Sequence, residues 1–384
     1  MDIRKIYTSK ITKDICKSAM IVIVFISVIL EMSGQTTQVF SLASNGTNRS
    51  FRIHFPSNIS DTKDRPVVIN MHGYGSNALE QEIYTQMDPV ADKEGFIVIY
   101  PDGINAAWNV GWSFGSTADD VLFTSDLIDY LVNNYSVDKQ RIYACGLSNG
   151  GFMSYYLACN LPNKIAAIAS VAGSMVPANV GLCSTNVPMP VMQIHGTNDQ
   201  VVPYTGLSPI SAPIESVVKF WVDHNGCQKT PTITPFTDIN TNDNTTSERY
   251  VYASGKNGSE VQFIKVTGGA HTWPGAIIDI DVTSKDFKAS EEIWAFFKRF
   301  SLQINSAVSD VSVLPVLGSN PVHEMLFLTT AVPVEGSIYN LSGQRLIDFY
   351  SAVGENSIDV TKLSAGQYFV KFKNSNVPVK FVKW

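Results

Sequence analysis

The sequence predicts an α/β fold class: a mostly parallel central sheet flanked by helices, followed by a small C-terminal all-β sandwich. Apolar strand-like runs alternate with segments of helical period as far as Phe300. Several of these runs end in polar, glycine-containing turns, which gather at the carboxyl edge of a parallel sheet. From Leu314 onward, short strand-like runs are separated only by turns, as in an all-β domain.

The N-terminal segment is typical of a targeting signal. Basic residues between Arg4 and Lys17 precede the apolar run Ala19–Leu30. This run is shorter than the roughly 20 residues that span a bilayer comfortably, and its order of basic and apolar parts matches a secretory signal. We therefore expect a signal peptide over residues 1–34, with an uncleaved membrane anchor as the alternative.

Residues 35–300 contain the alternating elements. Strands are predicted at Val67–Met71 and Gly95–Tyr100, and the second is apolar throughout, as expected in a sheet covered on both faces. A helix is predicted from Asp119 to Asn133, because its apolar residues have helical spacing and Asp119 or Asp120 stands near the cap position. Later elements include a strand at Ile165–Val171 and helices at Ile214–His224 and Ser290–Phe300.

The segment Arg141–Gly151 is typical of a nucleophile elbow, in which a strand, a sharp turn and a helix present a serine. Its Gly-x-Ser-x-Gly pattern places Ser148 between Gly146 and Gly150, where a Cβ atom would crowd the turn. Glycine and serine are also common in loops, so this pattern needs partner residues elsewhere in the chain.

Candidate partners follow later strand-like runs, in the order Ser, Asp, His that this type of site uses. Asp199 follows the run that starts at Val191, and His271 follows the run that starts at Val261. His271 is the one histidine that comes after both other candidates in such a turn. The remaining histidines have structural interpretations; they are His54, His72, His195, His224 and His323.

The loop after the Val67–Met71 strand has the sequence His-Gly-Tyr-Gly and is the candidate oxyanion loop. Acyl transfer needs two backbone N–H groups aimed at the developing oxyanion. We expect these donors to be the N–H groups of Tyr74 and of Asn149, the residue after the candidate nucleophile. His72 is expected to brace this loop as a buried side chain.

Four loop aromatics near these segments are candidate substrate-binding residues: Trp112, Trp273, Trp108 and Tyr204. Loop aromatics can stack on a sugar or a phenolic ring. The alternative is that they only pin their loops to the core.

Together these motifs resemble the α/β-hydrolase superfamily. Within it they are similar to the secreted esterases of the poly(3-hydroxybutyrate) depolymerase-like group, which includes feruloyl esterases and acetylxylan esterases of carbohydrate esterase family 1. The resemblance covers roughly residues 45–300 and rests on the motifs at 72–75, 146–151, 195–204 and 268–275. It implies an α/β-hydrolase catalytic domain over residues 35–300, with Ser148, Asp199 and His271 as its catalytic triad.

Composition limits the partners. A formal net charge of −6 without a Lys/Arg-rich patch argues against nucleic acid. No Cys and His spacing resembles a zinc site, and we expect neither metal nor cofactor. Export permits disulfides, and the cysteines after Cys16 allow three full pairings. Of these we favour Cys183–Cys227, with Cys145 as a buried free thiol.

A linker over residues 301–313 precedes the β-sandwich predicted over residues 314–384. Hairpins are predicted at Gly336–Phe349 and at Ser357–Lys373. This segment resembles the C-terminal sorting domain of bacterial type IX secretion in its motifs at 320–321, 338–344 and 359–368. A carbohydrate-binding module and a purely stabilising domain are the alternatives.

The predicted function is therefore a secreted or cell-surface serine esterase that works through an acyl-enzyme. The expected substrates are feruloyl or acetyl esters on plant polysaccharide, with a polyhydroxybutyrate-type polyester second. The expected partners are that substrate and the type IX secretion machinery, and we expect the chain to be a monomer. The alternatives are a serine peptidase of the same fold and a catalytically silent carbohydrate-binding protein.

Overall fold

The structure, a computed structural model, describes residues 37–56, 64–183, 185–302, 316–317, 321–330, 333–372 and 379–384. It divides into two compact units, residues 1–303 and 304–384, each with its own hydrophobic core. The predicted signal peptide at 1–34 lies outside the described residues, as does the predicted linker after residue 302. None of the described helices has the length and apolar character needed to cross a bilayer.

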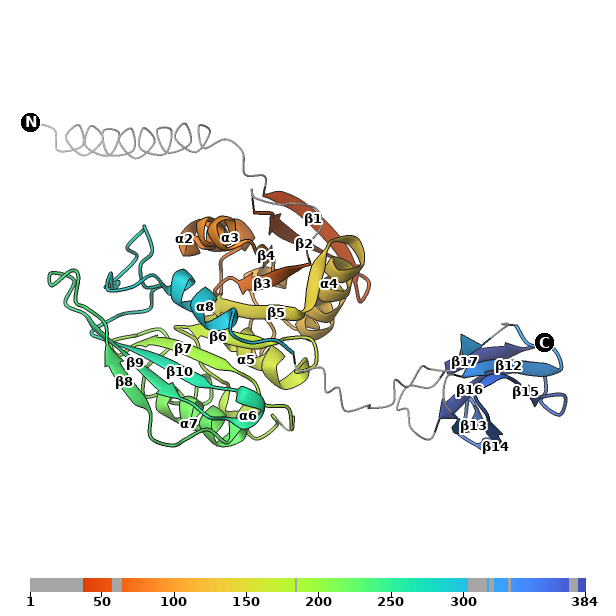
Figure 1. The fold of residues 1–384 in the computed structure, drawn as a ribbon. Coiled ribbons are helices and arrows are strands. Elements are labelled where there is room, and N and C mark those ends of the chain that lie inside the picture. The colour runs from red at the N-terminus through yellow and green to blue at the C-terminus, as the bar shows by residue number, and fades with distance from the viewer. Residues whose placement is uncertain are drawn as a thin grey trace, which may run out of the picture. The chain divides into compact units, whose positions relative to one another are not determined.

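A ten-stranded sheet forms the centre of the first unit (Figure 1). Its strands in chain order are β1 (Gln38–Ser44), β2 (Thr47–His54), β3 (Arg65–Met71), β4 (Ile97–Pro101), β5 (Val137–Leu147), β6 (Ala167–Val171), β7 (Val191–Gly196), β8 (Thr232–Pro235), β9 (Thr246–Tyr252) and β10 (Val261–Thr267). Their order in space is β1-β2-β4-β3-β5-β6-β7-β10-β9-β8. The stretch from β4 to β10 is parallel, which confirms the predicted mostly parallel sheet.

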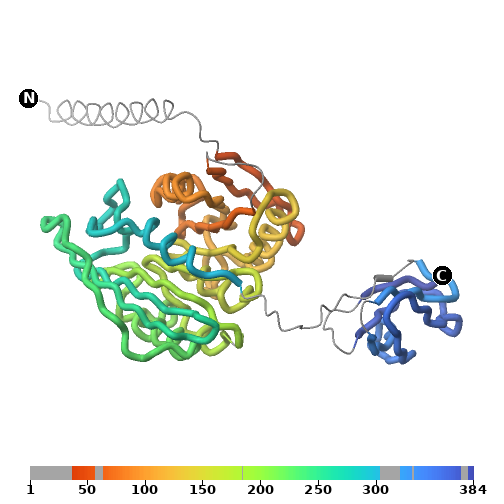
Figure 2. Tube along the Cα trace, in the orientation of Figure 1, coloured from red at the N-terminus to blue at the C-terminus, as the bar shows by residue number. Residues whose placement is uncertain are grey.

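Helices cover both faces of this sheet (Figure 2). The helical segments are α2 (Ala78–Thr85), α3 (Met87–Glu94), η1 (Ile104–Ala106), α4 (Asp120–Asn134), α5 (Asn149–Asn160), α6 (Pro177–Val180), α7 (Ile214–Asn225), η2 (Lys256–Gly258) and α8 (Ala289–Phe297). Alternation along β3 separates the two layers, because Val67 and Ile69 join the core under α4, α5 and α7. Val68 instead joins the core under α3 and α8. The predicted cap of α4 is confirmed, since Asp119 accepts the N–H of Leu122 at 2.9 Å.

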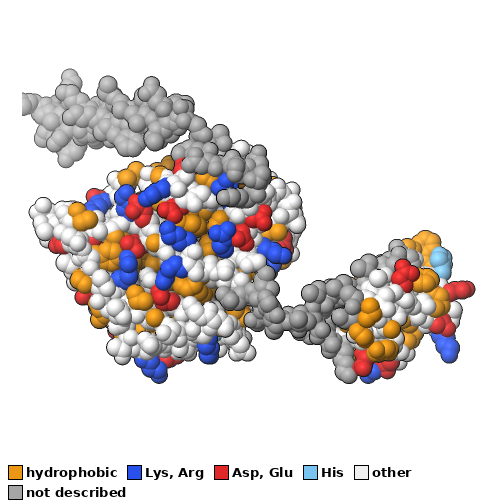
Figure 3. Space-filling view, viewed as in Figure 1, with side chains coloured by type: hydrophobic (Ala, Val, Ile, Leu, Met, Phe, Trp, Pro, Cys, Tyr) orange, Lys and Arg blue, Asp and Glu red, His pale blue; other side chains and the backbone are white. Residues whose placement is uncertain are grey.

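Charges of both signs are mixed on the surface of the first unit. On the face that Figure 3 shows, Lys and Arg side chains are interspersed with Asp and Glu side chains, and hydrophobic side chains lie between them. Neither sign accumulates on this face, so it offers no strong field to a highly charged partner.

The second unit is a sandwich of two antiparallel sheets. One sheet has the order β11-β12-β15 and the other β14-β13-β16-β17. These strands are β11 (Val316–Leu317), β12 (Met325–Thr330), β13 (Val334–Asn340), β14 (Arg345–Ser351), β15 (Gly354–Asp359), β16 (Gly366–Phe372) and β17 (Val379–Lys383). The first predicted hairpin is present as β13–β14. The second is wrong: β15 pairs with β12, and β16 pairs with β13 and β17. The buried Ile358 and Val370 approach one core from different sheets, which a hairpin would not allow.

The disulfide joins Cys159 to Cys183, so the predicted Cys183–Cys227 pairing is wrong. Cys159 lies at the C-terminal end of α5, and the loop after α6 brings Cys183 to a Cα–Cα distance of 5.1 Å. Cys227 is instead buried as a free thiol, with its Sγ 4.0 Å from the carbonyl oxygen of Ser259. Cys145 is also free and buried, as predicted. The pairing depends on how the α6 loop folds back, which local sequence does not encode.

Removing this bridge should destabilise the first unit. Closing a loop between residues 24 positions apart restricts the unfolded chain, and loss of that restriction costs about 3 kcal/mol. The Cys159→Ser/Cys183→Ser double variant should lose about that much free energy of unfolding in urea titration. Cys227→Ser is the matched control and should leave the disulfide-linked peptide unchanged in a non-reduced digest. A digest that links Cys183 to Cys227 would contradict the pairing.

Candidate active site

Ser148 occupies the sharp turn between β5 and α5. Its backbone has φ 54° and ψ −118°, a conformation that costs about 1–3 kcal/mol. Its N–H donates to the carbonyl oxygen of Val171 at 2.8 Å. A Cβ atom at Gly146 would lie 2.5 Å from the carbonyl oxygen of Met71, and one at Gly150 would overlap the same oxygen. The turn therefore packs on the end of β3 so closely that both flanking positions must be glycine.

Asp199 lies in the loop after β7 and is almost fully buried. Its Oδ1 accepts the backbone N–H groups of Val201 and Val202, both at 2.8 Å. Its Oδ2 accepts a hydrogen bond from Nδ1 of His271 at 2.8 Å, and the His271 side chain is 16% exposed. This bond selects the tautomer in which Nε2 of the imidazole carries a free lone pair, as a general base requires.

Backbone contacts join the two loops that carry this pair. The N–H of Thr197 donates to the carbonyl oxygen of Val266, and that of Asn198 donates to Gly269, both at 2.9 Å. A Cβ atom at Gly196 would overlap the carbonyl oxygen of Gly269, so only glycine permits this approach. Since β5, β6, β7 and β10 are successive neighbours in the sheet, the candidate nucleophile, carboxylate and base follow strands that end at one edge.

The candidate oxyanion loop passes directly beside the nucleophile. A Cβ atom at Gly73 would lie 3.5 Å from the Cβ of Ser148. Within the part of the chain that the structure describes, the backbone N–H groups of Tyr74 and Asn149 have no acceptor, so both are available to a substrate oxygen. His72 is buried and braces the loop, since its Nδ1 donates to Gly73 at 2.7 Å and its Nε2 accepts a backbone N–H at 2.9 Å. Burial lowers the pKa of His72, so its imidazole stays neutral.

The side chain of Asn149 has a structural role that its motif does not reveal. Its Oδ1 accepts the N–H of Trp108 at 2.7 Å, and its Nδ2 donates to the carbonyl oxygen of Trp108 at 3.2 Å. The indole N–H of Trp108 in turn donates to the carbonyl oxygen of His72 at 2.9 Å. These bonds attach the loop after β4 to both the nucleophile helix and the oxyanion loop. The partners are 41 residues apart, so no local pattern identifies them.

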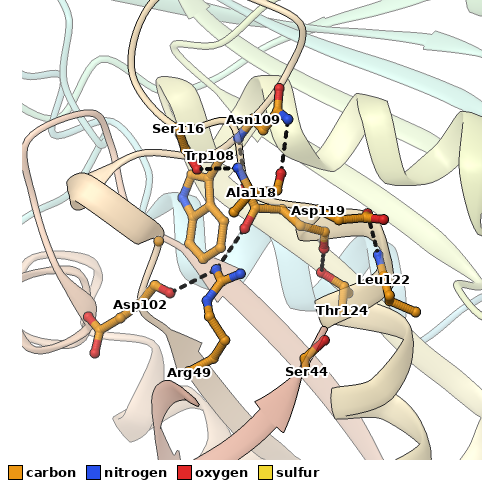
Figure 4. A network of polar contacts seen from close by, with 12 residues as sticks. Ser44, Arg49, Asp102, Trp108, Asn109, Ser116, Ala118, Asp119, Leu122 and Thr124 are labelled. Atoms are coloured by element: carbon orange, nitrogen blue, oxygen red, sulfur yellow. Dashed lines mark hydrogen bonds and ion pairs between the residues drawn. The ribbon is translucent and has the colours of Figure 1, made fainter. Parts of the chain in front are cut away.

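A buried ion pair anchors the far end of the same loop (Figure 4). An Nη2 atom of Arg49, on β2, lies 2.6 Å from Oδ1 of Asp120, and neither side chain is more than 3% exposed. The other carboxylate oxygen accepts the N–H of Asn109 at 2.7 Å, and the guanidinium lies 3.9 Å from the ring centre of Phe123. Burial raises the pKa of Asp120, while the Asn109 hydrogen bond and the charge of Arg49 oppose that rise. Sequence analysis identified Asp120 only as an N-terminal helix residue and did not single out Arg49.

Burial corrects two of the four predicted substrate-binding aromatics. Trp108 and Trp273 are each 1% exposed, so neither ring has a face on which a substrate could stack. Trp108 is held by its hydrogen bonds to Asn149 and His72. The indole N–H of Trp273 donates to Ser290 Oγ at 3.2 Å. Tyr204 is half-buried, and its hydroxyl donates to Glu215 at 2.9 Å. For these two tryptophans burial supports the alternative, in which the side chains pin their loops to the core.

Trp112 belongs to a group of three rings that sequence analysis identified only in part. We call Tyr74, Trp112 and Phe114 the aromatic shelf. Trp112 stacks on Phe114 with ring centres 5.0 Å apart, and Tyr74 meets Phe114 edge-on at 6.0 Å. The side chains of Tyr74 and Phe114 are 55% and 46% exposed. Because the Tyr74 N–H is a candidate oxyanion donor, the shelf borders the candidate site. Phe114 carried no sequence signal, since it stands in a loop without periodicity.

Comparisons with known proteins agree with this architecture. Residues 116–226 match the phospholipase/carboxylesterase family, and residues 319–383 match the secretion system C-terminal sorting domain. The first unit superposes on an acetyl xylan esterase from Aspergillus awamori with a TM-score of 0.51 at 14% identity, covering 68% of this chain and 99% of that chain. The first unit therefore has an α/β-hydrolase fold, and the second matches the sorting-domain family. The predicted fold and both predicted resemblances are thereby confirmed.

Two of the similar proteins carry the names of esterases. The chain is 33% identical over 267 residues to feruloyl esterase B of Piromyces equi, covering 66% of this chain and 46% of that protein. It is 27% identical over 261 residues to a bifunctional acetylxylan esterase/xylanase of Neocallimastix patriciarum, covering 67% of this chain and 34% of that protein. The chain thus spans less than half the length of each of these two relatives.

His195 supports the candidate site, although its position at the end of a strand does not reveal this role. Its Nε2 lies 2.9 Å from the carbonyl oxygen of Val202 and 3.4 Å from Oδ2 of Asp199. Its Nδ1 lies 3.1 Å from the amide nitrogen of Gln193. Burial lowers the pKa of His195 to about 4, against the opposing charge of Asp199. The imidazole is therefore neutral near pH 7 and supports the Asp199 loop by hydrogen bonding.

This neutral histidine should make stability depend on pH. Above pH 6.5 the imidazole is neutral in both the folded and the unfolded chain. Between pH 6.5 and about 4 only the unfolded chain binds the proton, so the free energy of unfolding decreases as the pH is lowered through this range. The full effect is about 3 kcal/mol. Urea titrations at pH 7 and pH 4 should show that the wild type loses about this much more free energy of unfolding than His195→Gln. Equal losses in the two proteins would contradict a neutral buried His195.

Proposed function

We propose that the chain is an exported serine esterase that hydrolyses carboxylic esters carried by plant polysaccharide, by way of an acyl-enzyme. The observation that carries this proposal is the Asp199–His271 hydrogen bond. The loops that bear these two residues follow strands that end at the same sheet edge as the strand before the strained Ser148 turn. A buried carboxylate that accepts two backbone N–H groups and one imidazole N–H suits the stabilisation of an imidazolium.

The proposed reaction is acyl transfer to water. His271 takes the hydroxyl proton of Ser148 as its Oγ attacks the ester carbonyl carbon, and Asp199 stabilises the resulting imidazolium. When the tetrahedral intermediate collapses, the alcohol leaves with the proton from His271. Water then attacks the acyl-enzyme with the same imidazole as general base, which releases the acid and restores Ser148.

The free N–H groups of Tyr74 and Asn149 support a role in holding the oxyanion of both tetrahedral intermediates. Such a donor is worth about 3 kcal/mol when it is aimed at the developing charge. The hydrogen bonds of the Asn149 side chain to Trp108 and of His72 to Gly73 hold the segments that carry these two N–H groups, so the donors need little reorganisation during the reaction.

The acyl group is proposed to pack on the aromatic shelf. Exposed apolar rings gain stability when a flat ring covers them, and the shelf lies beside a proposed oxyanion donor. The names of the relatives, feruloyl esterase and acetylxylan esterase, favour polysaccharide esters over a polyester. The exposed rings favour an aromatic acyl group such as feruloyl over acetyl.

The C-terminal sorting domain indicates export by type IX secretion and attachment at the cell surface. Such a location would place the hydrolase domain where polymers too large to enter the cell are found. We propose the secretion machinery as the partner of the second unit.

Ser148→Ala tests the proposed activity directly. Removing the nucleophile should lower kcat for methyl ferulate by at least about 10⁴-fold, because the residual rate comes only from binding and the oxyanion donors. Initial rates followed by absorbance measure this, with the exposed Ser136→Ala as the matched control. Retained hydrolysis in Ser148→Ala would refute the nucleophile. Peptide cleavage without ester cleavage by the wild type would favour a peptidase, and activity towards neither would favour a silent binding protein.

Phe114→Ala tests the role of the aromatic shelf. Loss of one stacking ring should lower kcat/KM for methyl ferulate by about tenfold and leave methyl acetate within about twofold, because an acetyl group is too short to reach the ring. Leu79→Ala, another exposed apolar residue, is the control. An equal fall for both esters would show that Phe114 supports the loop and does not contact the acyl group.

A further inference from the structure

A second cleft lies on the hydrolase domain between α7 and the sheet strands β9 and β10, which Figure 1 shows beside one another. Its volume is about 550 Å³. One wall is formed by residues 215–223 of α7, the other by side chains of β9 and β10, and Lys229 stands at one end. None of the proposed catalytic residues lines this cleft.

The wall formed by the strands is aromatic. Tyr250 and Tyr252 are two positions apart on β9 and therefore point to the same face of the sheet. Tyr250 pairs with Phe263 of β10, and their ring centres are 5.7 Å apart. Both tyrosines remain partly exposed, whereas Phe263 is buried. The cleft thus has two neighbouring phenol rings over an apolar floor.

Polar groups of both signs surround these rings. Lys219 forms an ion pair with Asp223 along α7, and Lys265 lies 3.9 Å from Glu215. Lys229 lies 3.6 Å from the same Asp223, so the cleft has three lysines and two carboxylates and a formal charge of +1. In the described part of the chain, the hydroxyl groups of Ser216 and Tyr252 make no hydrogen bond to protein, so they can bond to a ligand.

We propose that this cleft binds a neutral oligosaccharide, and so keeps a polysaccharide chain on the enzyme surface while the separate site acts on its esters. A sugar ring presents an apolar face that stacks on phenol rings and hydroxyl groups that bond to paired charges and free hydroxyls. Because every lysine of the cleft lies near a carboxylate, a strongly charged ligand would gain little net attraction there. The choice of a plant-type glycan rests on the proposed function, whereas the cleft's chemistry does not.

The test measures sugar binding in a protein that cannot cleave esters. Ser148→Ala is titrated calorimetrically with xylohexaose and, in a second arm, with cellohexaose. We expect saturable binding to at least one glycan with a Kd of about 1 mM or tighter. Adding Tyr252→Ala should weaken it at least about tenfold, and the exposed Tyr350→Ala on the sorting domain should leave it unchanged.

A second variant guards against misfolding of the tyrosine variant. Ser216→Trp changes an exposed position on α7 and should fill the cleft, so it should abolish binding while a thermal melt stays unchanged. In the otherwise wild-type enzyme it should leave kcat/KM for methyl ferulate within about twofold and reduce release of ferulate from insoluble arabinoxylan. Absence of binding to either glycan, or binding that survives both cleft variants, would overturn the proposal. Glycan binding by a wild type that cleaves no ester would sink only the proposed activity.

Discussion

The contact between the turn at Ser148 and the end of β3 is the constraint on which the rest of the candidate site depends. The carbonyl oxygen of Met71 occupies the space that side chains at Gly146 and Gly150 would need. This contact keeps Ser148 in a strained backbone conformation and places Gly73 of the oxyanion loop against it. Helix α5 therefore starts at a position that β3 dictates.

Polar side chains hold the irregular segments against this rigid centre. The loop between β4 and α4 has little secondary structure. The side chain of Asn149 holds its first half by hydrogen bonds to Trp108, and the Arg49–Asp120 ion pair holds its second half. Breaking a buried ion pair of this kind costs about 3–5 kcal/mol, since the remaining charge is left without a partner. The loop bears Trp112 and Phe114, so the position of the aromatic shelf depends on a pair that never contacts a substrate.

The sequence predicted the strands, turns and helices whose structure depends on residues close together in the chain. Strand runs that end in glycine and polar residues located Ser148, Asp199 and His271 on their loops, and the apolar periods located the helices. The sequence did not predict features that depend on contacts between segments far apart in the chain. Cys159 pairs with Cys183 because the α6 loop folds back on α5, and Trp108 and Trp273 are buried because other loops cover them. Arg49 carried no signal because its partner lies on α4. The division between buried and exposed aromatics is likewise a property of packing.

We propose that one serine in this chain is chemically activated by the residues around it. Reaction with a fluorophosphonate, followed by peptide mass spectrometry, tests it most directly, because the reagent labels only serines that have an active base and an oxyanion site. We expect one adduct, on Ser148, in the wild type and its loss in His271→Ala. A label on another residue, or a Ser148 adduct that forms equally fast without His271, would contradict it.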